Sequence, residues 1–338
     1  MAIFMPKLKI AVVGPGLIGK QHIQFVHENA NSELISIVAP NTSINTAIAV
    51  ENKVPIFYSI EECLKNCQPD GVIISSPNPF HAEQARYCIE AGIAVLIEKP
   101  LTASVVEGLS LVRLAQEKKA KVLVGHHRAH SPLMKTARDV IKSGRIGRVV
   151  SVIGSAQFYK PASYFAEGPW RTQIGGGPIL INLIHEIGNL RSLVGEITAV
   201  QAITSSSIRN FKVEDTVVMN FVFGNGALGT FVLSDTAASA KSWEQTSGEN
   251  SSYPMYIDED CYSIAGTHGS LSIPSMRLKY YPAGISPSWW SPFDEQVIKV
   301  DRQNPLQIQF AHFLDVIRGK SLPLVFVAVG YSLFVFFY

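Results

Sequence analysis

The sequence predicts an α/β protein with a doubly wound parallel sheet followed by a second α/β domain built on a mostly antiparallel sheet. Three observations support this fold class. The chain has 338 residues, which is enough for two domains with sizeable cores. Over the first 125 residues, short apolar runs alternate with helical patterns, which is typical of βαβ units. After about residue 130, β-like runs follow one another with few helices between them, which favours antiparallel pairing.

The first domain is expected to span residues 1–128. Its strands are predicted at Lys9–Val13, Leu34–Val38, Gly71–Ser75, Ala94–Ile97 and Lys121–Val124. Its helices are predicted at Ile18–Glu28, Asn45–Val50, Ile60–Lys65, Phe80–Ala91 and Val105–Lys118. Because crossovers between parallel strands are right-handed, this alternation makes the sheet doubly wound.

The second domain is expected to span residues 129–338. Its helices are predicted at Pro132–Ser143, Pro178–Val194 and Leu306–Arg318. Its strands are predicted at Arg148–Gln157, Ile197–Ser205, Thr216–Phe223, Gly229–Thr236, Cys261–Ala265, Ser270–Ile273, Leu278–Tyr281 and Gln296–Val300. The small, polar segment Ser234–Ser252 is expected to be an exposed loop.

The composition excludes several classes of protein. Hydrophobic residues make up 47% and charged residues 17%, so the chain is globular rather than disordered. The net charge is +2 without a basic block, so no nucleic-acid partner is expected. The cysteines are scattered without metal-ligand spacing, which indicates inert thiols in a reducing, cytoplasmic compartment. They are Cys63, Cys67, Cys88 and Cys261.

The apolar, uncharged run Leu322–Tyr338 leaves two alternatives open. It is either a packed terminal strand or helix, or a membrane tail at the lower limit of a spanning length. No basic anchor follows the run, and Gly330 and Ser332 interrupt it. These features favour the packed alternative and argue against a membrane partner.

A glycine turn joins the first predicted strand to the first helix. Gly14 allows the tight turn, Gly16 lets phosphates approach the backbone, and Gly19 lets the helix and the strand pack closely. The amides at the helix start, at Leu17 and Ile18, can hold a pyrophosphate. The turn therefore predicts dinucleotide binding, as in a Rossmann domain.

The end of the second strand should distinguish NAD from NADP, because an acid there bonds the ribose 2′-hydroxyl. The sequence reads Ala39-Pro40-Asn41, with neither an acid nor an arginine. Without the carboxylate, a 2′-phosphate meets no repulsion, and Asn41, Thr42 and Ser43 can donate to it. Ala39 and Asn41 are thus predicted to contact the cofactor, and the choice between NAD and NADP stays open, leaning to NADP.

Two further strand ends carry polar residues, and such ends border the ligand crevice of a doubly wound sheet. Ser76 and Asn78 are predicted to contact the cofactor, whereas His81 is either a cofactor contact or a structural residue at a helix start. Glu98-Lys99-Pro100 places Lys99 at the next strand end with Glu98 beside it, and both are predicted to contact the cofactor. A lysine there can bond a substrate hydroxyl and transfer a proton, and the alternative is a surface ion pair.

The turn after the fifth strand reads Gly125-His126-His127-Arg128-Ala129-His130. Its histidines make a metal site conceivable, but neighbouring residues of an extended chain point in opposite directions and no carboxylate or cysteine is near. No metal is therefore predicted, and His127 and Arg128 are expected to contact the cofactor or the substrate.

The helix after Gly175-Gly176-Gly177-Pro178 carries Asn182, His185 and Asn189, whose spacing puts them on one face. His185 is the predicted general acid/base because its unperturbed pKa lies near neutrality, and a histidine satisfied within the core is the alternative. Asn182, with Trp170 and Arg171 of the preceding loop, is predicted to shape a substrate pocket.

These motifs, in this order from about Leu8 to Val325, resemble the glucose–fructose oxidoreductase and inositol dehydrogenase (Gfo/Idh/MocA) family. The resemblance implies a Rossmann domain and a second α/β domain whose large open sheet mediates homodimers or homotetramers. It also implies NAD(P)-dependent oxidation and reduction of a secondary alcohol on a sugar, polyol or cyclitol, with Lys99 and His185 beside the nicotinamide.

The chain departs from the family pattern at three places. Ile181 stands where many members have an aspartate, with Asn182 next to it as a possible substitute, and Gly188 stands where many have an acid. The segment after Val325 is apolar instead of polar. Three alternatives therefore stay open: an enzyme that recycles a tightly bound cofactor, a dinucleotide-binding regulator without turnover, and a membrane-tethered form.

Overall fold

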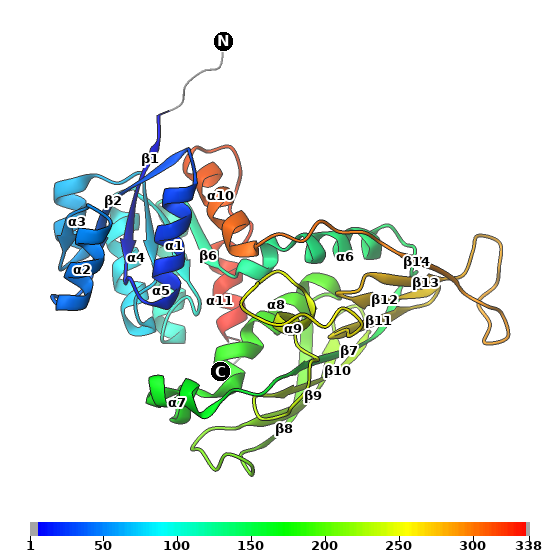
Figure 1. Cartoon of the computed structure of the whole chain (residues 1–338). Helices are drawn as coiled ribbons and strands as arrows, with labels where there is room; N and C mark the ends of the chain where they lie inside the picture. Colours follow the sequence, from blue (N-terminus) through cyan, green and yellow to red (C-terminus); the bar gives the residue numbers. More distant parts are fainter. Residues whose placement is uncertain (1–5, 336–338) are drawn as a thin grey trace. The chain divides into compact units, whose positions relative to one another are not determined.

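The computed structural model describes residues 6–335, which form two units (Figure 1). The first unit runs to His130 and takes up the chain again from Leu306, and the second unit is Ser131–Pro305. The first break lies close to the expected boundary after residue 128. The segment from Leu306, expected in the second domain, packs instead with the first unit.

The first unit is built on a parallel sheet, as the sequence predicts. Within the described residues the strand order is β3-β2-β1-β4-β5-β6, and every neighbouring pair is parallel. The strands are β1 Leu8–Val13, β2 Ser32–Val38, β3 Ile56–Phe57, β4 Gly71–Ile74, β5 Ala94–Glu98 and β6 Val122–Gly125. The two-residue β3 is too short to leave a periodic signal and was not predicted.

Helices cover both faces of this sheet. They are α1 Leu17–Glu28, α2 Ser43–Glu51, α3 Ile60–Cys67, α4 His81–Glu90 and α5 Val105–Glu117, with short turns η1 Asn78–Phe80 and η2 His127–His130. Alternate residues of each strand enter opposite cores. On β1, Ala11 and Val13 pack with α3, α4 and α5, whereas Ile10 and Val12 pack with α1 and α2.

The returning segment adds one helix to each layer. Phe310 and Phe313 of α10 (Pro305–Ile317) are buried in the core that contains α1. α11 (Val327–Val335) packs on α5 and β6, and a Cβ on Gly330 would lie 2.7 Å from the side chain of Val124. The described part of the apolar run Leu322–Tyr338 therefore ends in a packed helix, and residues 336–338 lie outside the described residues. No described helix has the length and apolarity needed to cross a membrane.

The second unit contains the predicted mostly antiparallel sheet. Its order is β14-β13-β12-β11-β7-β10-β9-β8, and only β7 and β10 pair in parallel among the described strands. The strands are β7 Val149–Gln157, β8 Ile197–Ser205, β9 Thr216–Phe223, β10 Leu228–Ser234, β11 Tyr262–Gly266, β12 Gly269–Ile273, β13 Arg277–Tyr280 and β14 Asp294–Val297.

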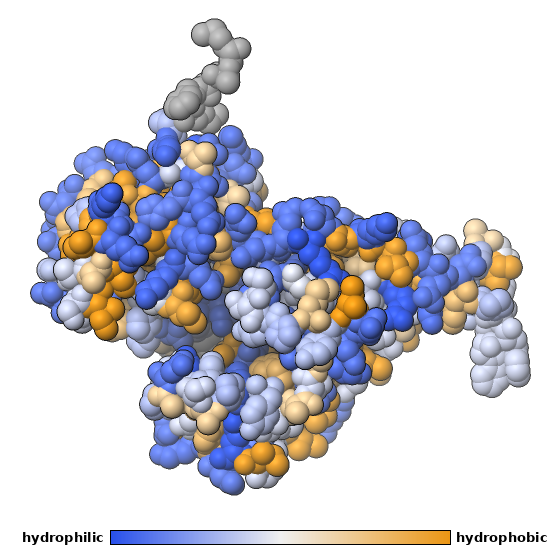
Figure 2. Space-filling view, viewed as in Figure 1, coloured by the Kyte–Doolittle hydropathy of each residue, from blue (hydrophilic) through white to orange (hydrophobic). Residues whose placement is uncertain are grey.

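One face of this sheet is buried and the other is open. Val217, Met219, Phe221 and Phe223 of β9 are buried, and Val218 and Val222, which alternate with them, are exposed. This period-2 alternation is typical of a sheet that is packed on one side only. On the side drawn in Figure 2, hydrophobic residues are interspersed with hydrophilic ones.

Two described helices of the second unit lie where the sequence predicts helices, α6 Pro132–Lys142 and α8 Ile184–Leu193. The short helices α7 Ala162–Glu167 and α9 Trp243–Thr246 were not predicted, and short turns form at η3 Pro169–Thr172 and η4 Ile179–Leu183. Ser234–Ser252, expected to be an exposed loop, is partly buried instead. Trp243 of α9 donates to the buried Glu249 (3.1 Å), which also accepts from Ser131 before α6, so the buried carboxylate of this segment has hydrogen-bond partners inside the fold.

Candidate active site

The glycine turn between β1 and α1 has the geometry of a phosphate cradle. A Cβ on Gly14, where φ is +80°, would lie 2.6 Å from Ser76 Cα, and a Cβ on Gly19 would lie 2.1 Å from Gly14 O. A Cβ on Gly16 would meet nothing within 4 Å, so the turn is open where phosphates would approach. Gly16 has no side chain to cap α1, Leu17 is 85% exposed, and Ile18 is half-buried. These residues fit a dinucleotide pyrophosphate.

The loop after β4 lies against this turn. Ser75 Oγ donates to Gly14 O (2.9 Å), and Ser76 Oγ donates to Gln84 Oε1 (2.6 Å). Asn78 is exposed. His81 is buried, with its ring nitrogens 2.7 Å from Ser76 O and 2.9 Å from Pro100 O. His81 therefore ties the loop after β4 to the loop after β5.

Glu98 is buried at the end of β5 and bonds to a residue that the sequence did not single out. His22 Nε2 of α1 donates to Glu98 Oε1 (2.8 Å). Burial alone would raise the pKa of Glu98, but the hydrogen bond and charge of His22, with the charge of Lys99, hold this pKa below its usual value. Glu98 thus fastens α1 to the end of β5, directly before Lys99.

The turn after β6 brings His127 and Arg128 into the same region of the first unit. Burial, followed by the charge of Arg128, lowers the pKa of the half-buried His127 to about 3, so its imidazole is neutral near pH 7. The charges of Glu98 and Lys99 also act on it. Arg128 itself is buried. A neutral imidazole beside a strand-end lysine can accept or donate a hydrogen bond.

The two residues at the end of β2 that are predicted to contact the cofactor differ in exposure. Ala39 is buried and Asn41 is exposed. Thr42 caps α2 by accepting from Asn45 N (3.2 Å), which leaves its hydroxyl hydrogen available to donate.

In the second unit, Glu214 caps the helix that carries Asn182 and His185. Its Oε1 accepts from Ile179 N (2.9 Å), and burial raises the pKa of this carboxyl despite that bond. Gly177, at φ +79°, permits the approach, because a Cβ there would lie 2.7 Å from Glu214 Oε1. The first turn of the predicted helix is a π-turn, η4, before α8 begins at Ile184.

Lys160 is a buried lysine that the sequence did not single out. It follows β7, is 9% exposed, and donates through Nζ to Asn182 Oδ1 (2.7 Å). Its Nζ lies 3.6 Å from Asp235 Oδ2, and Asp235 also accepts from Arg209 Nε (2.8 Å). Asn182 is half-buried and His185, three residues later, is buried.

The other polar residues of this helix bond elsewhere. Asn189 donates to Tyr262 Oη (3.0 Å), and the same hydroxyl bonds to the buried Glu186. Asn182 and Asn189, which the spacing places on one face of a regular helix, therefore bond to different partners. The π-turn η4 is wider than a regular helical turn and changes the helical register before α8.

Trp170 and Arg171 lie on η3. Trp170 is 54% exposed. The Arg171 guanidinium lies 3.9 Å above the ring of Tyr164 and also bonds to Tyr164 O. Arg171 is thus fixed by an aromatic ring while Trp170 faces outward.

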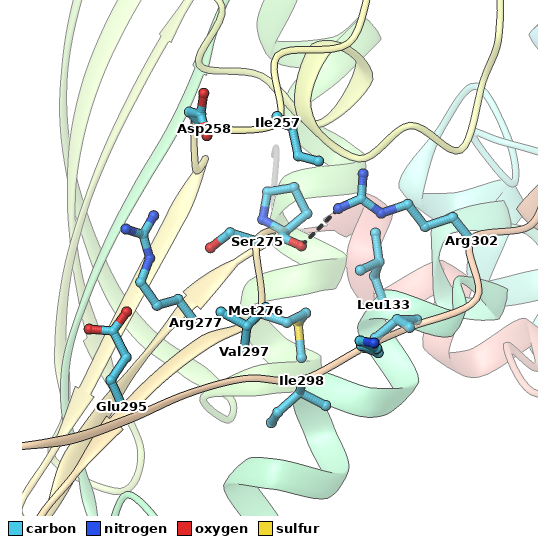
Figure 3. A pocket seen from close by; sticks show the side chains of 13 residues that line it. Leu133, Ile257, Asp258, Ser275, Met276, Arg277, Glu295, Val297, Ile298 and Arg302 are labelled. Carbon is cyan, nitrogen blue, oxygen red and sulfur yellow. Dashed lines mark hydrogen bonds between the residues drawn. The ribbon is translucent and has the colours of Figure 1, made fainter.

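A cavity of about 670 Å³ lies elsewhere in the second unit, between the β12–β13 turn and the segment after β14 (Figure 3). None of the predicted site residues lines it. Its arginines have partners within the unit: Arg277 lies 3.5 Å from Asp260 Oδ2, and Arg302 donates to Pro274 O (3.5 Å), as the dashed line shows. In the described part of the chain, no cluster of histidine, cysteine or acidic side chains could hold a metal.

Comparison with known proteins identifies the two halves separately. Residues 8–126 match a family model described as the oxidoreductase family with an NAD-binding Rossmann fold. Residues 134–272 match the GFO/IDH/MocA C-terminal domain. Together the matches cover the glycine turn, Lys99, Asn182 and His185.

Similar proteins include several sugar and polyol dehydrogenases. A 1,5-anhydro-D-fructose reductase of Ensifer adhaerens is 27% identical over 92% of this chain and 89% of its own. An inositol 2-dehydrogenase of Corynebacterium glutamicum is 31% identical over 44% of each chain. Among solved structures, the WlbA dehydrogenase of Bordetella pertussis in complex with NADH and UDP-GlcNAcA has a TM-score of 0.77 at 22% identity, covering 98% of this chain and 94% of that one. At this identity the structural likeness supports the fold alone.

Proposed function

Because the chain belongs to the GFO/IDH/MocA family of oxidoreductases, we propose that it interconverts a secondary alcohol and a ketone on a sugar, polyol or cyclitol. The observation that carries this proposal is the open Gly16 position, in a turn whose other two glycines, Gly14 and Gly19, leave no room for a Cβ. The named activities of the 1,5-anhydro-D-fructose reductase and the inositol 2-dehydrogenase support the substrate class.

The proposed chemistry divides between two residues of the chain. A bound nicotinamide supplies the hydride acceptor or donor. Lys99 bonds the substrate oxygen and stabilises the alkoxide that develops on it. His185 takes the hydroxyl proton during oxidation and returns it during reduction. Trp170, Arg171, Arg128 and Asn182 are proposed to contact the substrate.

The cofactor preference follows from the end of β2. Ala39-Pro40-Asn41 has no carboxylate to repel a 2′-phosphate, and Asn41 and the Thr42 hydroxyl can donate to one. The proposal is therefore NAD or NADP, leaning to NADP. His127, Asn78 and Ser76 are proposed as further cofactor contacts, whereas Glu98 and His81 act by holding the loops in place.

We also propose that the protein is a homodimer or homotetramer in the cytoplasm. The open face of the second sheet supports the oligomer, because Ile203, Val218 and Val222 on neighbouring strands are exposed together. The reducing compartment is supported by the cysteines, none of which forms a disulfide within the described residues. Light scattering after gel filtration tests the oligomer, and a monomeric mass for the wild type contradicts it.

The decisive test is a titration with NAD(H) and NADP(H), followed by tryptophan fluorescence and melting temperature. Micromolar binding of one dinucleotide is expected, and a screen with 1,5-anhydro-D-fructose, inositol and UDP-sugars then follows the reduced cofactor by absorbance. Lys99→Ala should lower turnover strongly and leave dinucleotide affinity nearly unchanged. Near-wild-type turnover in that variant refutes the role of Lys99, and failure to bind either dinucleotide refutes the function. Cofactor retained through gel filtration would favour an enzyme that recycles it.

A further inference from the structure

We propose that Lys160 is a positioning residue that fixes Asn182 as a hydrogen-bond donor to an oxo oxygen of the substrate. This inference rests on the proposed function for its substrate, and on the contacts of the second unit for its geometry. Neither the sequence motifs nor the similarity to known proteins assigns a role to Lys160.

The contact itself fixes the orientation of the amide. Lys160 Nζ lies 2.7 Å from Asn182 Oδ1. An ammonium group has donors and no acceptor, so the amide oxygen must face it, whatever orientation is assigned to the amide. The amide NH₂ group of Asn182 then points away from Lys160 with its two hydrogens. An aspartate at the same place could offer only acceptors.

Lys160 is itself held in one position. Its backbone N–H donates to Asp235 O (2.9 Å), and its carbonyl accepts from Arg209 Nη2 (2.8 Å). Its Nζ lies above the rings of Tyr164 (4.9 Å) and Phe158 (5.4 Å). Backbone bonds and aromatic rings therefore leave the ammonium little freedom, as a positioning residue requires.

Charge balance argues against a purely structural role. The buried Asp235 carboxylate accepts from Arg209 Nε at 2.8 Å, whereas its distance to Lys160 Nζ is 3.6 Å. Arg209 alone can neutralise Asp235, so the fold does not need Lys160 for that purpose. The shorter bond of Lys160 is to Asn182, three residues before His185 on the same helical segment.

This arrangement gives the site a preference. A ketone oxygen can accept a hydrogen bond from the Asn182 NH₂ group. A hydroxyl oxygen can accept the same bond only when its own O–H points toward a different acceptor. Without Lys160 the amide can rotate and lose this selectivity. The ketone form of the substrate should therefore bind less tightly, and the effect should appear in KM more than in kcat.

The test is a double-mutant cycle of Lys160→Met and Asn182→Ala, with 1,5-anhydro-D-fructose and the preferred reduced dinucleotide as substrates. Methionine keeps length and packs well on aromatic rings. We expect Lys160→Met to raise KM about tenfold to a hundredfold, because one hydrogen bond to a charged group is lost. The KM of the double variant should be little higher than that of Asn182→Ala. Lys160→Arg should recover part of the loss. The control Lys241→Met, at an exposed lysine paired with Glu259, should leave KM unchanged.

Two outcomes overturn the proposal. An unchanged KM in Lys160→Met, or additive effects of the two substitutions, means that Lys160 does not act through Asn182. The same cycle on melting temperature does not depend on the substrate. If the wild type reduces no ketone, the proposed function and the preference for a ketone fail together. Non-additive changes in melting temperature would still support the Lys160–Asn182 bond, and additive changes would refute it.

Discussion

His22 and Glu98 are 76 residues apart in the chain, and their side chains form a buried hydrogen bond of 2.8 Å. His22 lies on the helix that follows the glycine turn, and Glu98 precedes Lys99. The bond thus joins the element proposed to hold the pyrophosphate to the element proposed to hold the substrate oxygen. Both elements belong to the first unit.

Replacing His22 with leucine should destabilise the first unit strongly. The carboxylate of Glu98 would stay buried without its main donor, and breaking a buried pair in this way costs about 3–5 kcal/mol. Urea denaturation at neutral pH measures the change in the free energy of unfolding. The control is His27→Leu on the same helix, where an exposed histidine bonds Asn52, and a change below about 1 kcal/mol is expected there. Equal effects at both positions would contradict the assignment.

The same bond predicts a loss of stability in acid. The pKa of Glu98 is lower in the folded protein than its unfolded value of about 4.3. The unfolded state therefore binds the proton first, so the stabilisation is complete above about pH 4.3 and is lost as the pH falls toward the folded pKa. Glu98→Gln should flatten this part of the stability profile. A profile that is unchanged by Glu98→Gln would exclude Glu98 as its source.

His127 should remain neutral far below the usual pKa of histidine. Burial and the charge of Arg128 lower its folded pKa to about 3, against about 6.5 in the unfolded chain. Between these values the unfolded state binds one more proton, so His127 makes stability rise with pH across this window. Proton NMR of the imidazole, assigned by loss of one signal in His127→Asn, should show no titration between pH 7 and pH 5. A midpoint near 6.5 would refute this prediction.

The thiols should differ sharply in reactivity. Burial raises the pKa of Cys63 to about 11 and that of Cys88 to about 12, and Cys261 is also buried. Because the thiolate is the reactive species, only the half-buried Cys67 should react quickly with an aromatic disulfide reagent at mildly alkaline pH. Cys67→Ser should abolish the fast phase. More than one fast thiol in the native protein would argue against this order.

The sequence predicts features that depend on short stretches of chain. The glycine turn specifies its own geometry, and the β-like runs Ile197–Ser205 and Thr216–Phe223 coincide with two strands to the residue. The succession of such runs with few helices between them also predicts the mostly antiparallel second sheet.

Partners that are distant in sequence are not predictable in this way. Which residue meets Glu98 depends on how α1 packs across the parallel sheet, and which residue meets Asn182 depends on where the chain runs after β7. A lysine between the aromatic residues Phe158 and Tyr164 is a weak signal in the sequence. Only the fold shows that Lys160 bonds to Asn182. The same limit applies to the segment from Leu306. The local sequence pattern predicts a helix there but does not show that α10 and α11 pack on the sheet of the first unit.

The three glycines of the turn should separate folding from binding. Gly19→Ala should destabilise the first unit, because the added methyl would lie 2.1 Å from Gly14 O, which is backbone. Gly14→Ala should do the same, through contact with Ser76 and a positive φ that costs about 1–2 kcal/mol for a residue with a side chain. Melting temperature measures both effects.

Gly16→Ala is the matched variant, and it should weaken dinucleotide binding without lowering the stability of the fold. Its methyl meets no protein atom within 4 Å, so the fold and melting temperature of the free protein should hardly change. The methyl would occupy the space where phosphates are proposed to approach the amides of Leu17 and Ile18, so the dinucleotide Kd should rise about tenfold or more, equivalent to about 1.4 kcal/mol. Wild-type affinity in a well-folded Gly16→Ala protein would show that the pyrophosphate does not bind at this turn, and the cofactor would then have to be sought at another strand end.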